Sequence, residues 1–254
     1  MTSPDALGLR CRSPALVGVL GGMGPQATLD FLQKLVSNTP AGRDQEHLPV
    51  LVASVPQIPD RTRAFQGRGE SPLPALRANA RRLVAGGVDL IVMPCNTAHL
   101  WFDALAATLP VPMLHIVDAA LDAITARCGE AVEIGLLATS ATIDSGLYPS
   151  RSRRIRTSFA PRWHVPTVAE QADWVTPAIE AIKAGRTREA TSLLLNAGDA
   201  LIARGASALL LACTELPLAL SESALSVPVI DAGEALARQT VRWHEARPRR
   251  ACTP

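Results

Sequence analysis

The sequence has few aromatic residues, no long apolar run and no excess of charge of either sign. Aromatic residues make up 4% and charged residues 19% of the 254 residues, and the formal net charge is +2. This balance gives no electrostatic reason to bind nucleic acid or an anionic membrane surface. No apolar stretch reaches the length of a membrane span, and the polar start, Met1–Ser13, lacks the apolar region of a secretory signal. We therefore expect a cytoplasmic, folded protein.

Cysteine is scarce, and its arrangement excludes two common uses. The 5 cysteines are widely spaced and odd in number. Thiols stay reduced in the cytoplasm, so we expect no disulfide framework. No CxxC pair or cluster of histidine and cysteine is present, so we expect no metal site. The glycine turn Gly21–Gly24 is not a GxGxxG motif, and a carboxylate at the helix that follows suits it better than a dinucleotide.

Two of the cysteines occupy the same point of an internal repeat. The segment Leu83–Cys95 aligns with Leu201–Cys213 at an offset of 118 residues. In both segments a helix end, a glycine turn, an apolar strand and a cysteine follow one another, and polar residues come next. Open α/β sheets place their sites at the carboxyl ends of strands. The repeat therefore predicts two similar α/β halves, with Cys95 and Cys213 facing one site between them.

Predicted strands and helices alternate along the whole chain. Strands are predicted at 15–20, 48–55, up to Cys95, 111–116, 132–139, up to Cys213 and 227–230, with a weak strand at 157–159. This alternation predicts parallel sheets with right-handed crossovers. We expect a first α/β domain at 15–116 plus 228–246, a second at 117–227, and flexible ends at 1–14 and 247–254.

A pair of thiols can carry out acid–base chemistry without a cofactor. A thiolate is a base and a thiol an acid, so a pair on opposite faces of one carbon can racemise or epimerise it. An ordinary thiol has a pKa of about 8.5, and a helix N-terminus after each cysteine would lower it. A lone cysteine at the end of an apolar strand is more often a packing residue. Two at equivalent points of a repeat favour catalysis, whereas Cys11, Cys128 and Cys252 lack this context.

The other candidate residues have ordinary explanations on spacing alone. Arg61, in a loop rich in proline, is either a carboxylate ligand or an exposed charge. Lys183, in the last turn of a predicted helix, suits a helix-dipole role. His99 either tunes Cys95 or starts the next helix, and His115 is either a core residue or a site residue.

Six stretches resemble the aspartate/glutamate racemase family, and most of all its aspartate racemase branch. They are GGMGPQAT (Gly21–Thr28), DQEHLPVLVASVPQIPDRT (Asp44–Thr62), MPCNTAH (Met93–His99), GLLATSAT (Gly135–Thr142), IKAG (Ile182–Gly185) and ACTELPL (Ala212–Leu218). The cysteine motifs are typical of the wider superfamily, and the combination of GGMGP with QIPDR is much narrower.

The resemblance implies a fold, an activity and a set of site residues. The implied fold is α/β, with two flavodoxin-like domains related by pseudo-twofold symmetry. The implied activity is racemisation of aspartate or glutamate without pyridoxal phosphate, metal or other cofactor, usually in a homodimer. Cys95 and Cys213 correspond to the acid/base pair, and Arg61 and Lys183 to the ligands of the side-chain carboxylate. The other positions that match the substrate pocket are Met23, Gln57, Asn96, Thr97, Thr142 and Thr214.

Two other classes of function stay open. One is a cysteine-dependent isomerase or decarboxylase on the same fold, similar to maleate isomerase. The other is an amino-acid binder that kept the pocket but does not exchange the α-proton. The QIPDR, CNT and CTE motifs favour the racemase.

Overall fold

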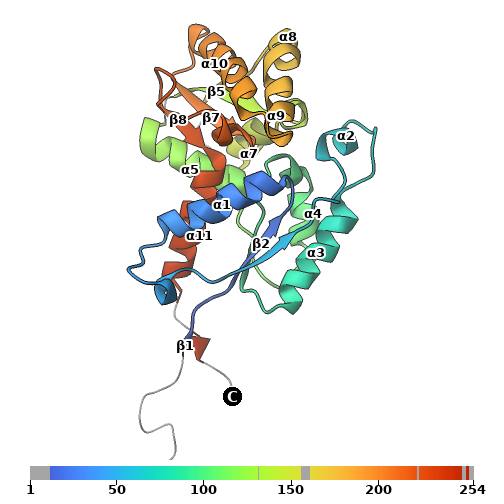
Figure 1. The fold of residues 1–254 in the computed structure, drawn as a ribbon, viewed down its shortest axis with the longest axis vertical. Helices are drawn as coiled ribbons and strands as arrows, with labels where there is room; N and C mark the ends of the chain where they lie inside the picture. The colour runs from blue at the N-terminus through green and yellow to red at the C-terminus, as the bar shows by residue number, and fades with distance from the viewer. Residues whose placement is uncertain (1–11, 131, 156–160, 222, 248–249, 252–254) are drawn as a thin grey trace, which may run out of the picture.

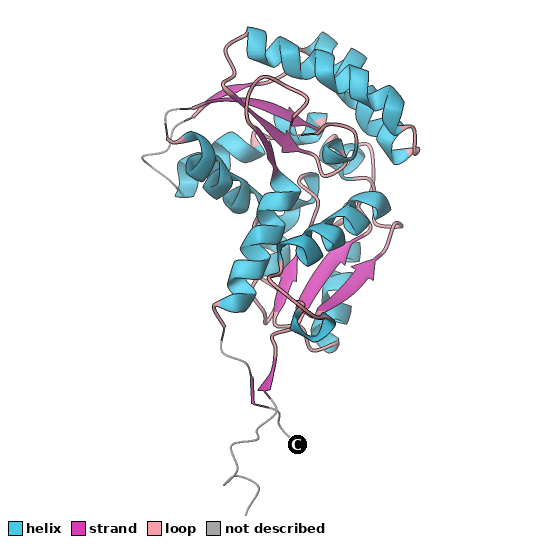
Figure 2. Ribbon diagram, turned by 60° about the vertical axis from the view of Figure 1, so that its left-hand side comes forward, coloured by secondary structure: helices cyan, strands magenta, loops and turns pink. Residues whose placement is uncertain are grey.

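Two parallel sheets form the framework of the protein (Figure 1, Figure 2). The computed structural model describes residues 12–130, 132–155, 161–221, 223–247 and 250–251. The first sheet has the order β3-β2-β4, with β2 at Val17–Gly21, β3 at Val50–Ser54 and β4 at Leu90–Val92. The second has the order β6-β5-β7-β8, with β5 at Glu133–Ala138, β6 at Arg162–His164, β7 at Ala208–Ala212 and β8 at Val229–Asp231. The fold is the predicted α/β class.

Helices connect the strands and cover both faces of each sheet. The α-helices are α1 (Pro25–Asn38), α2 (Arg61–Phe65), α3 (Leu73–Ala85), α4 (Phe102–Ala106), α5 (Ile116–Cys128), α6 (Ser140–Asp144), α7 (Leu147–Ile155), α8 (Val168–Glu170), α9 (Thr176–Lys183), α10 (Thr187–Ala203) and α11 (Ala232–Glu245). Short 3₁₀ segments lie at Asp44–Glu46, Thr97–Trp101 and Leu216–Leu218. In the described residues, no helix is long and apolar enough to cross a membrane.

The buried side chains form three layers of core. The largest cluster joins the two sheets through α1, α5 and α11, with Phe31, Leu121 and Leu236 among its members. Figure 1 shows these helices at the junction of the two halves. A second cluster packs α9 and α10 on the outer face of the second sheet. A third packs α3 on the outer face of the first sheet. Apolar burial is continuous across the junction, so the two halves support each other.

Equivalent glycines in the two sheets show that the repeat is structural. Gly18 lies beside Ile91, and Gly135 lies beside Leu209, which is the matching residue of the repeat. A Cβ atom on Gly18 would lie 3.3 Å from Leu83, and one on Gly135 would lie 3.1 Å from Leu201, the matching helix residue of the repeat. In each half the helix before the cysteine strand therefore packs closely on a glycine of the central strand.

Three expectations need correction or stay open. The strand predicted at 111–116 is reduced to one bridge between Met113 and Ile91, because α5 already begins at Ile116. The strand β8, assigned to the first domain, is hydrogen bonded to β7 in the second sheet, whereas α11 packs on both α1 and α5. The exact domain limits stay a prediction. The weak strand at 157–159 lies outside the described residues.

The ends of the chain differ in part from the expected flexible segments. Arg12–Ser13 pairs antiparallel with Arg250–Ala251, so the two ends meet in a two-stranded sheet.

Candidate active site

The two repeat cysteines line one cavity at the carboxyl ends of their strands. Cys213 directly follows β7, and Cys95 lies a short way past β4. Both are free thiols and both are buried. The cavity between them has a volume of about 20 Å³, which is room for about one water molecule. The structure thus brings together two residues that are 118 positions apart in the sequence.

Most of the predicted site residues line this cavity. Those that do are Met23, Arg61, Cys95, Asn96, Thr97, Lys183, Cys213 and Thr214. Gln57 is exposed and is not among the lining residues. Thr142 is fully buried and is not a lining residue, but its hydroxyl is hydrogen bonded to that of Thr97, which lines the cavity. A larger groove of about 710 Å³ runs between α5 and α11, but no cysteine lines it, so we place the site at the smaller cavity.

Four lining residues were not among the predicted site residues. They are Asp60, Thr62, Thr139 and Glu215. Each is a direct neighbour of a predicted residue or belongs to a quoted motif, so the motifs contained the signal. What they could not show is which of their side chains face the cavity.

Cys213 is hydrogen bonded to a buried carboxylate. Its Sγ donates to Oε2 of Glu215 over 3.0 Å, and Oε1 of Glu215 accepts from the backbone N–H of Gly24 over 3.0 Å. Gly24 belongs to the glycine turn of the first half, so Glu215 joins the two halves at the site. Burial raises the pKa of Cys213 well above its ordinary value, and the charge of Glu215 raises this pKa further, against the opposing effect of Lys183.

Cys95 has a different set of neighbours. Burial raises its pKa, and the positive charge of Arg61 acts in the opposite direction. The backbone amide of Ala98, in the 3₁₀ segment that follows, also lowers the pKa of Cys95. The expected lowering by a helix N-terminus is thus present at Cys95, but the cost of burying the thiolate outweighs it. Both thiols are therefore protonated more readily than an exposed cysteine in this closed cavity.

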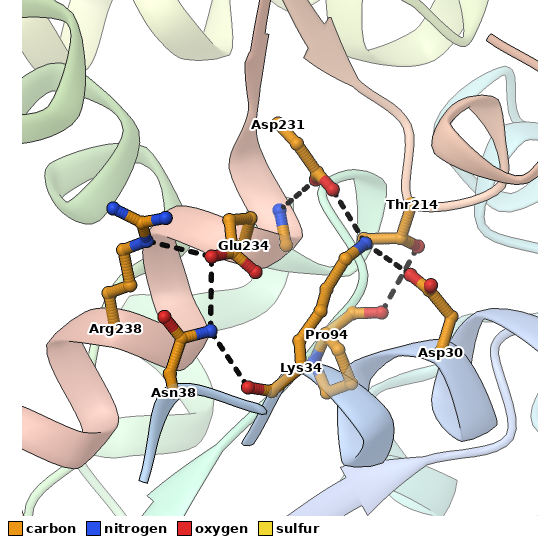
Figure 3. Close-up of polar contacts among 9 residues, drawn as sticks. Asp30, Lys34, Asn38, Pro94, Thr214, Asp231, Glu234 and Arg238 are labelled. Atoms are coloured by element: carbon orange, nitrogen blue, oxygen red, sulfur yellow. Dashed lines mark hydrogen bonds and ion pairs between the residues drawn. The ribbon is translucent and has the colours of Figure 1, made fainter. Parts of the chain in front are cut away.

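Hydroxyl groups from both halves meet at the cavity wall. The Oγ1 atoms of Thr97, Thr139 and Thr142 lie 2.8–3.1 Å apart in a closed triangle. Thr97 follows Cys95, whereas the other two follow β5. Oγ1 of Thr214 donates to the carbonyl oxygen of Pro94 over 3.2 Å (Figure 3). Each cysteine loop is therefore hydrogen bonded to the opposite half.

Asn96 presents an unpaired donor inside the protein. Its Oδ1 accepts a 2.5 Å hydrogen bond from the hydroxyl of Tyr148, which is fully buried. Its Nδ2 is buried and has no partner among the described residues. Because Asn96 lines the cavity, the Tyr148 contact fixes the amide orientation in which Nδ2 remains free for an acceptor.

Arg61 and Lys183 stand at the mouth of the cavity without a carboxylate partner among the described residues. Arg61 is half-buried, and its Nη1 donates to the carbonyls of Ile58 and Pro59. Both cations, with Glu215, also line an outer cavity of about 200 Å³. They separate the inner cavity from the outer one, where the N-terminus of α1 is also exposed.

The helix that carries Lys183 contains a π-turn. This turn, at Gln171–Val175, continues directly into α9, whose last residue is Lys183. One extra residue in a turn rotates all later residues by about 100° around the helix axis. The π-turn therefore sets which side of α9 reaches the cavity.

Two buried histidines support the Cys95 loop rather than line the cavity. Nδ1 of His99 bonds the carbonyl oxygen of Cys95 over 2.8 Å, and its Nε2 accepts from the N–H of Ile116 over 3.1 Å. Burial lowers the pKa of His99 to about 4, and it also lowers the pKa of His115, whose ring contacts that of His99. The neutral tautomer of His99 with hydrogen on Nδ1 satisfies both contacts.

A partly buried ion pair lies near the site at the junction of the halves. Lys34 of α1 contacts Asp231 over 2.6 Å and also pairs with Asp30 (Figure 3). Asp231 ends β8 and caps α11 through the N–H of Gly233. This pair fixes α1, which begins with the glycine turn, against the strand next to β7.

The residues described by the structure include no group of three or more His, Cys, Asp or Glu side chains that could hold a metal ion.

Comparison with known proteins gives matches over most of the chain. The Asp/Glu/hydantoin racemase family matches residues 20–240. The broad specificity amino-acid racemase RacX of Bacillus subtilis is 28% identical over 237 residues, covering 91% of this chain and 99% of that protein. The aspartate racemase of Picrophilus torridus is 33% identical and superposes with a TM-score of 0.81, covering 92% of this chain and 95% of that one.

A more distant match supports the fold alone. The glutamate racemase of Campylobacter jejuni has a TM-score of 0.62 at 20% identity, covering 92% of this chain and 88% of that one. The two sheets, each with its own covering helices, are the two flavodoxin-like domains of this fold.

Proposed function

Because this chain belongs to the Asp/Glu/hydantoin racemase family and is an amino-acid racemase, we propose that it interconverts L- and D-aspartate by two-base proton transfer. Cys95 and Cys213 are the acid/base pair, and glutamate is the second substrate to be expected. The proposal includes a homodimer that needs no cofactor, as the family resemblance implies, and the cytoplasmic location expected from the sequence.

The observation that carries this proposal is the pairing of two thiols in one cavity with two cations at its mouth. Thiolate and thiol on opposite faces of an α-carbon can remove one proton and supply another. Arg61 and Lys183 offer a positive site for a side-chain carboxylate. This combination favours a dicarboxylic amino acid over a neutral one.

The remaining polar groups suit the α-carboxylate. Nδ2 of Asn96 is a free buried donor, and Thr97 lines the same cavity. A bound carboxylate would satisfy the amide that has no partner now. Donors fixed in advance by Tyr148 also lower the cost of ordering the site around the substrate.

The site must open to admit a substrate. The inner cavity holds about one water, and an amino acid is several times larger. Arg61 and Lys183 line both the inner cavity and the outer one, so these two side chains must move aside. Closure over the substrate would then exclude water from the thiols.

The test is incubation of the protein with a panel of L-amino acids in D₂O, after dialysis and EDTA treatment. Chiral chromatography and mass spectrometry report inversion and α-deuterium uptake together. We expect both with aspartate. Deuterium uptake without inversion would favour a different cysteine enzyme, and binding without either would favour a non-catalytic binder. Cys128→Ala, which changes a cysteine away from the cavity, should keep full activity.

A further inference from the structure

The two thiols of the cavity are equally buried but have unequal neighbours. Cys95 is 6% and Cys213 is 5% exposed. Cys213 donates a hydrogen bond to the carboxylate of Glu215, whereas Cys95 meets the backbone amide of Ala98 and the charge of Arg61. Both sulfurs meet a backbone donor and a cation, but Cys213 also faces a carboxylate acceptor at hydrogen-bond distance.

We propose that Glu215 is a further catalytic residue, which holds Cys213 in the thiol form so that the resting enzyme carries its base on Cys95 and its acid on Cys213. This inference rests on the proposed two-base racemisation. It adds the role of Glu215, which makes the two thiols unequal in acidity and so decides which of them acts first as the base.

The position of Glu215 leaves its carboxylate little freedom. Glu215 is 4% exposed, and its Oε1 is held by the N–H of Gly24. A Cβ atom added to Gly24 would lie 3.2 Å from this oxygen, so the carboxylate is packed closely against the glycine turn. The other oxygen, Oε2, is thereby directed at Cys213. An ionised carboxylate only accepts hydrogen bonds, so the sulfur 3.0 Å away must carry the hydrogen.

Loss of that hydrogen would place two negative charges side by side in a buried site. Such a pair disfavours the charged form of either member. Among the described residues, Lys183 is the cation whose charge lowers the pKa of Cys213, and the charge of Glu215 has the larger, opposite effect. Tyr148, which lies near Cys213, is uncharged, since burial raises its pKa. At Cys95, the charges of Arg61 and Lys183 lower the pKa and the charge of Glu215 raises it, and Arg61 has the largest effect of the three.

The proposal gives the reaction a defined starting state. The Cys95 thiolate takes the α-proton of the enantiomer that faces it, and the Cys213 thiol gives its proton to the opposite face. The product then leaves an enzyme with a Cys95 thiol and a Cys213 thiolate beside Glu215. This form is less stable, so one proton must move from Cys95 back to Cys213, through solvent, before the same direction can start again.

Labelling of the thiols tests the order of ionisation without any turnover. Wild type, Glu215→Gln and the control Glu189→Gln are treated with iodoacetamide between pH 6 and 10, and mass spectrometry of peptides gives the rate at each cysteine. Only the thiolate reacts, so the rate follows ionisation. Glu189 is an exposed partner of Arg186, and its removal also deletes one negative charge. In the wild type, labelling of Cys95 should have its midpoint at a lower pH than that of Cys213.

Glu215→Gln should favour the thiolate form of Cys213, whereas the wild-type carboxylate favours the thiol. A glutamine can accept from Gly24 with its oxygen and donate to Cys213 with its nitrogen, which stabilises the thiolate. We expect the Cys213 rate below the midpoint to rise at least ~10-fold, as for a pKa lowered by one, and the Cys95 rate to rise less. Glu189→Gln should change neither rate. An unchanged Cys213 rate in Glu215→Gln, or faster labelling of Cys213 than Cys95 in the wild type, would overturn the proposal.

Two further measurements keep the test decisive. If Glu215→Gln does not fold, the test uses the order of labelling in the wild type together with the variant Glu215→Asp. This variant draws the carboxylate back from the sulfur of Cys213. A labelling rate of Cys213 that Glu215→Asp leaves unchanged counts against the proposal. In a Cys95→Ala background, Glu215→Gln should speed α-deuterium exchange through Cys213. If the cysteines are labelled in the expected order but no amino acid is inverted, the proposed racemase function is wrong, whereas the proposed effect of Glu215 on Cys213 stands.

Discussion

Thr214 and Pro94 join the two cysteine loops directly. The hydroxyl of Thr214, which follows Cys213, donates to the carbonyl oxygen of Pro94, which precedes Cys95, over 3.2 Å (Figure 3). Thr214 is buried, so neither group has water as a ready substitute. This hydrogen bond spans the two halves and fixes one thiol relative to the other.

Thr214→Val should separate activity from stability. The loss of a buried hydrogen bond with its acceptor left unpaired costs about 1–3 kcal/mol of unfolding free energy. Because misplacement of a catalytic group is costly, we also expect kcat to fall on the order of 10-fold or more. Steady-state kinetics and urea unfolding measure the two effects. Thr240→Val is the matched control, since Thr240 is buried and bonds only the carbonyl of Leu236 in its own helix. Equal losses of kcat in both variants would contradict this role of Thr214.

Arg61→Ala should cost selectively for dicarboxylic substrates. A charged hydrogen bond to a side-chain carboxylate is worth roughly 1.5–3 kcal/mol, so kcat/KM for aspartate should fall about 10- to 100-fold or more. No gain on alanine is expected, because removal of one charge does not build an apolar pocket. Arg63→Ala, in the same helix α2 but exposed, is the control and should stay close to wild type. Wild-type kinetics of Arg61→Ala on aspartate would reject the assignment.

Tyr148→Phe should weaken substrate binding through Asn96. Without the phenol, Oδ1 of Asn96 loses its donor and the amide no longer has a fixed orientation. If Nδ2 binds the α-carboxylate equally in the ground and transition states, KM rises on the order of 10-fold with kcat little changed. The double variant Tyr148→Phe/Asn96→Ala should be no worse than Asn96→Ala alone, which kinetics of the three proteins can check. Additive losses would mean that the tyrosine acts elsewhere.

The cysteine pair could be predicted because the internal repeat can be recognised from the sequence alone. Helix end, glycine, strand and thiol recur at one offset, and the matching contacts of Gly18 and Gly135 show that the repeat reflects packing. Parallel pairing of β2 with β4 and of β5 with β7 then brings both thiols to the strand ends. The same logic explains why the α/β class could be predicted.

Residues that act through tertiary contacts could not be placed by sequence. Tyr148 and Glu215 lie 52 and 191 positions from their partners Asn96 and Gly24, and no local pattern encodes such contacts. Gln57 shows the converse, since its motif is specific but its side chain is exposed in a surface loop. The pKa of the thiols depends on burial, which propensity cannot measure.

Acidification should destabilise the protein through the buried histidines. Unfolded histidine has a pKa of about 6.5, whereas burial lowers the pKa of His99 to about 4. The unfolded state therefore binds more protons between these values, so the stability is fully present above pH 6.5 and is lost as the pH falls toward 4. His99 accounts for up to about 3 kcal/mol, and the lowered pKa of His115 acts in the same direction. Urea unfolding at pH 7, 6 and 5 should show the decline, and His99→Gln should flatten it. An equal slope in this variant would contradict the prediction.

The last prediction concerns the two thiols as a pair. Each must reach one face of the α-carbon, so their sulfurs should lie roughly 6–8 Å apart around a bound substrate, far from the about 2.05 Å of a disulfide. Every turnover needs both groups, so Cys95→Ala and Cys213→Ala should each lose inversion in both directions by at least ~10²–10⁴-fold. The remaining thiolate can still take the α-proton that faces it and return solvent hydrogen to the same face. Each variant should therefore show slow α-deuterium exchange without inversion, on opposite enantiomers, as measured by chiral chromatography and mass spectrometry in D₂O. Cys128→Ala serves as the control with unchanged inversion, and retained inversion in either cavity variant would replace the two-base reaction with a one-cysteine mechanism.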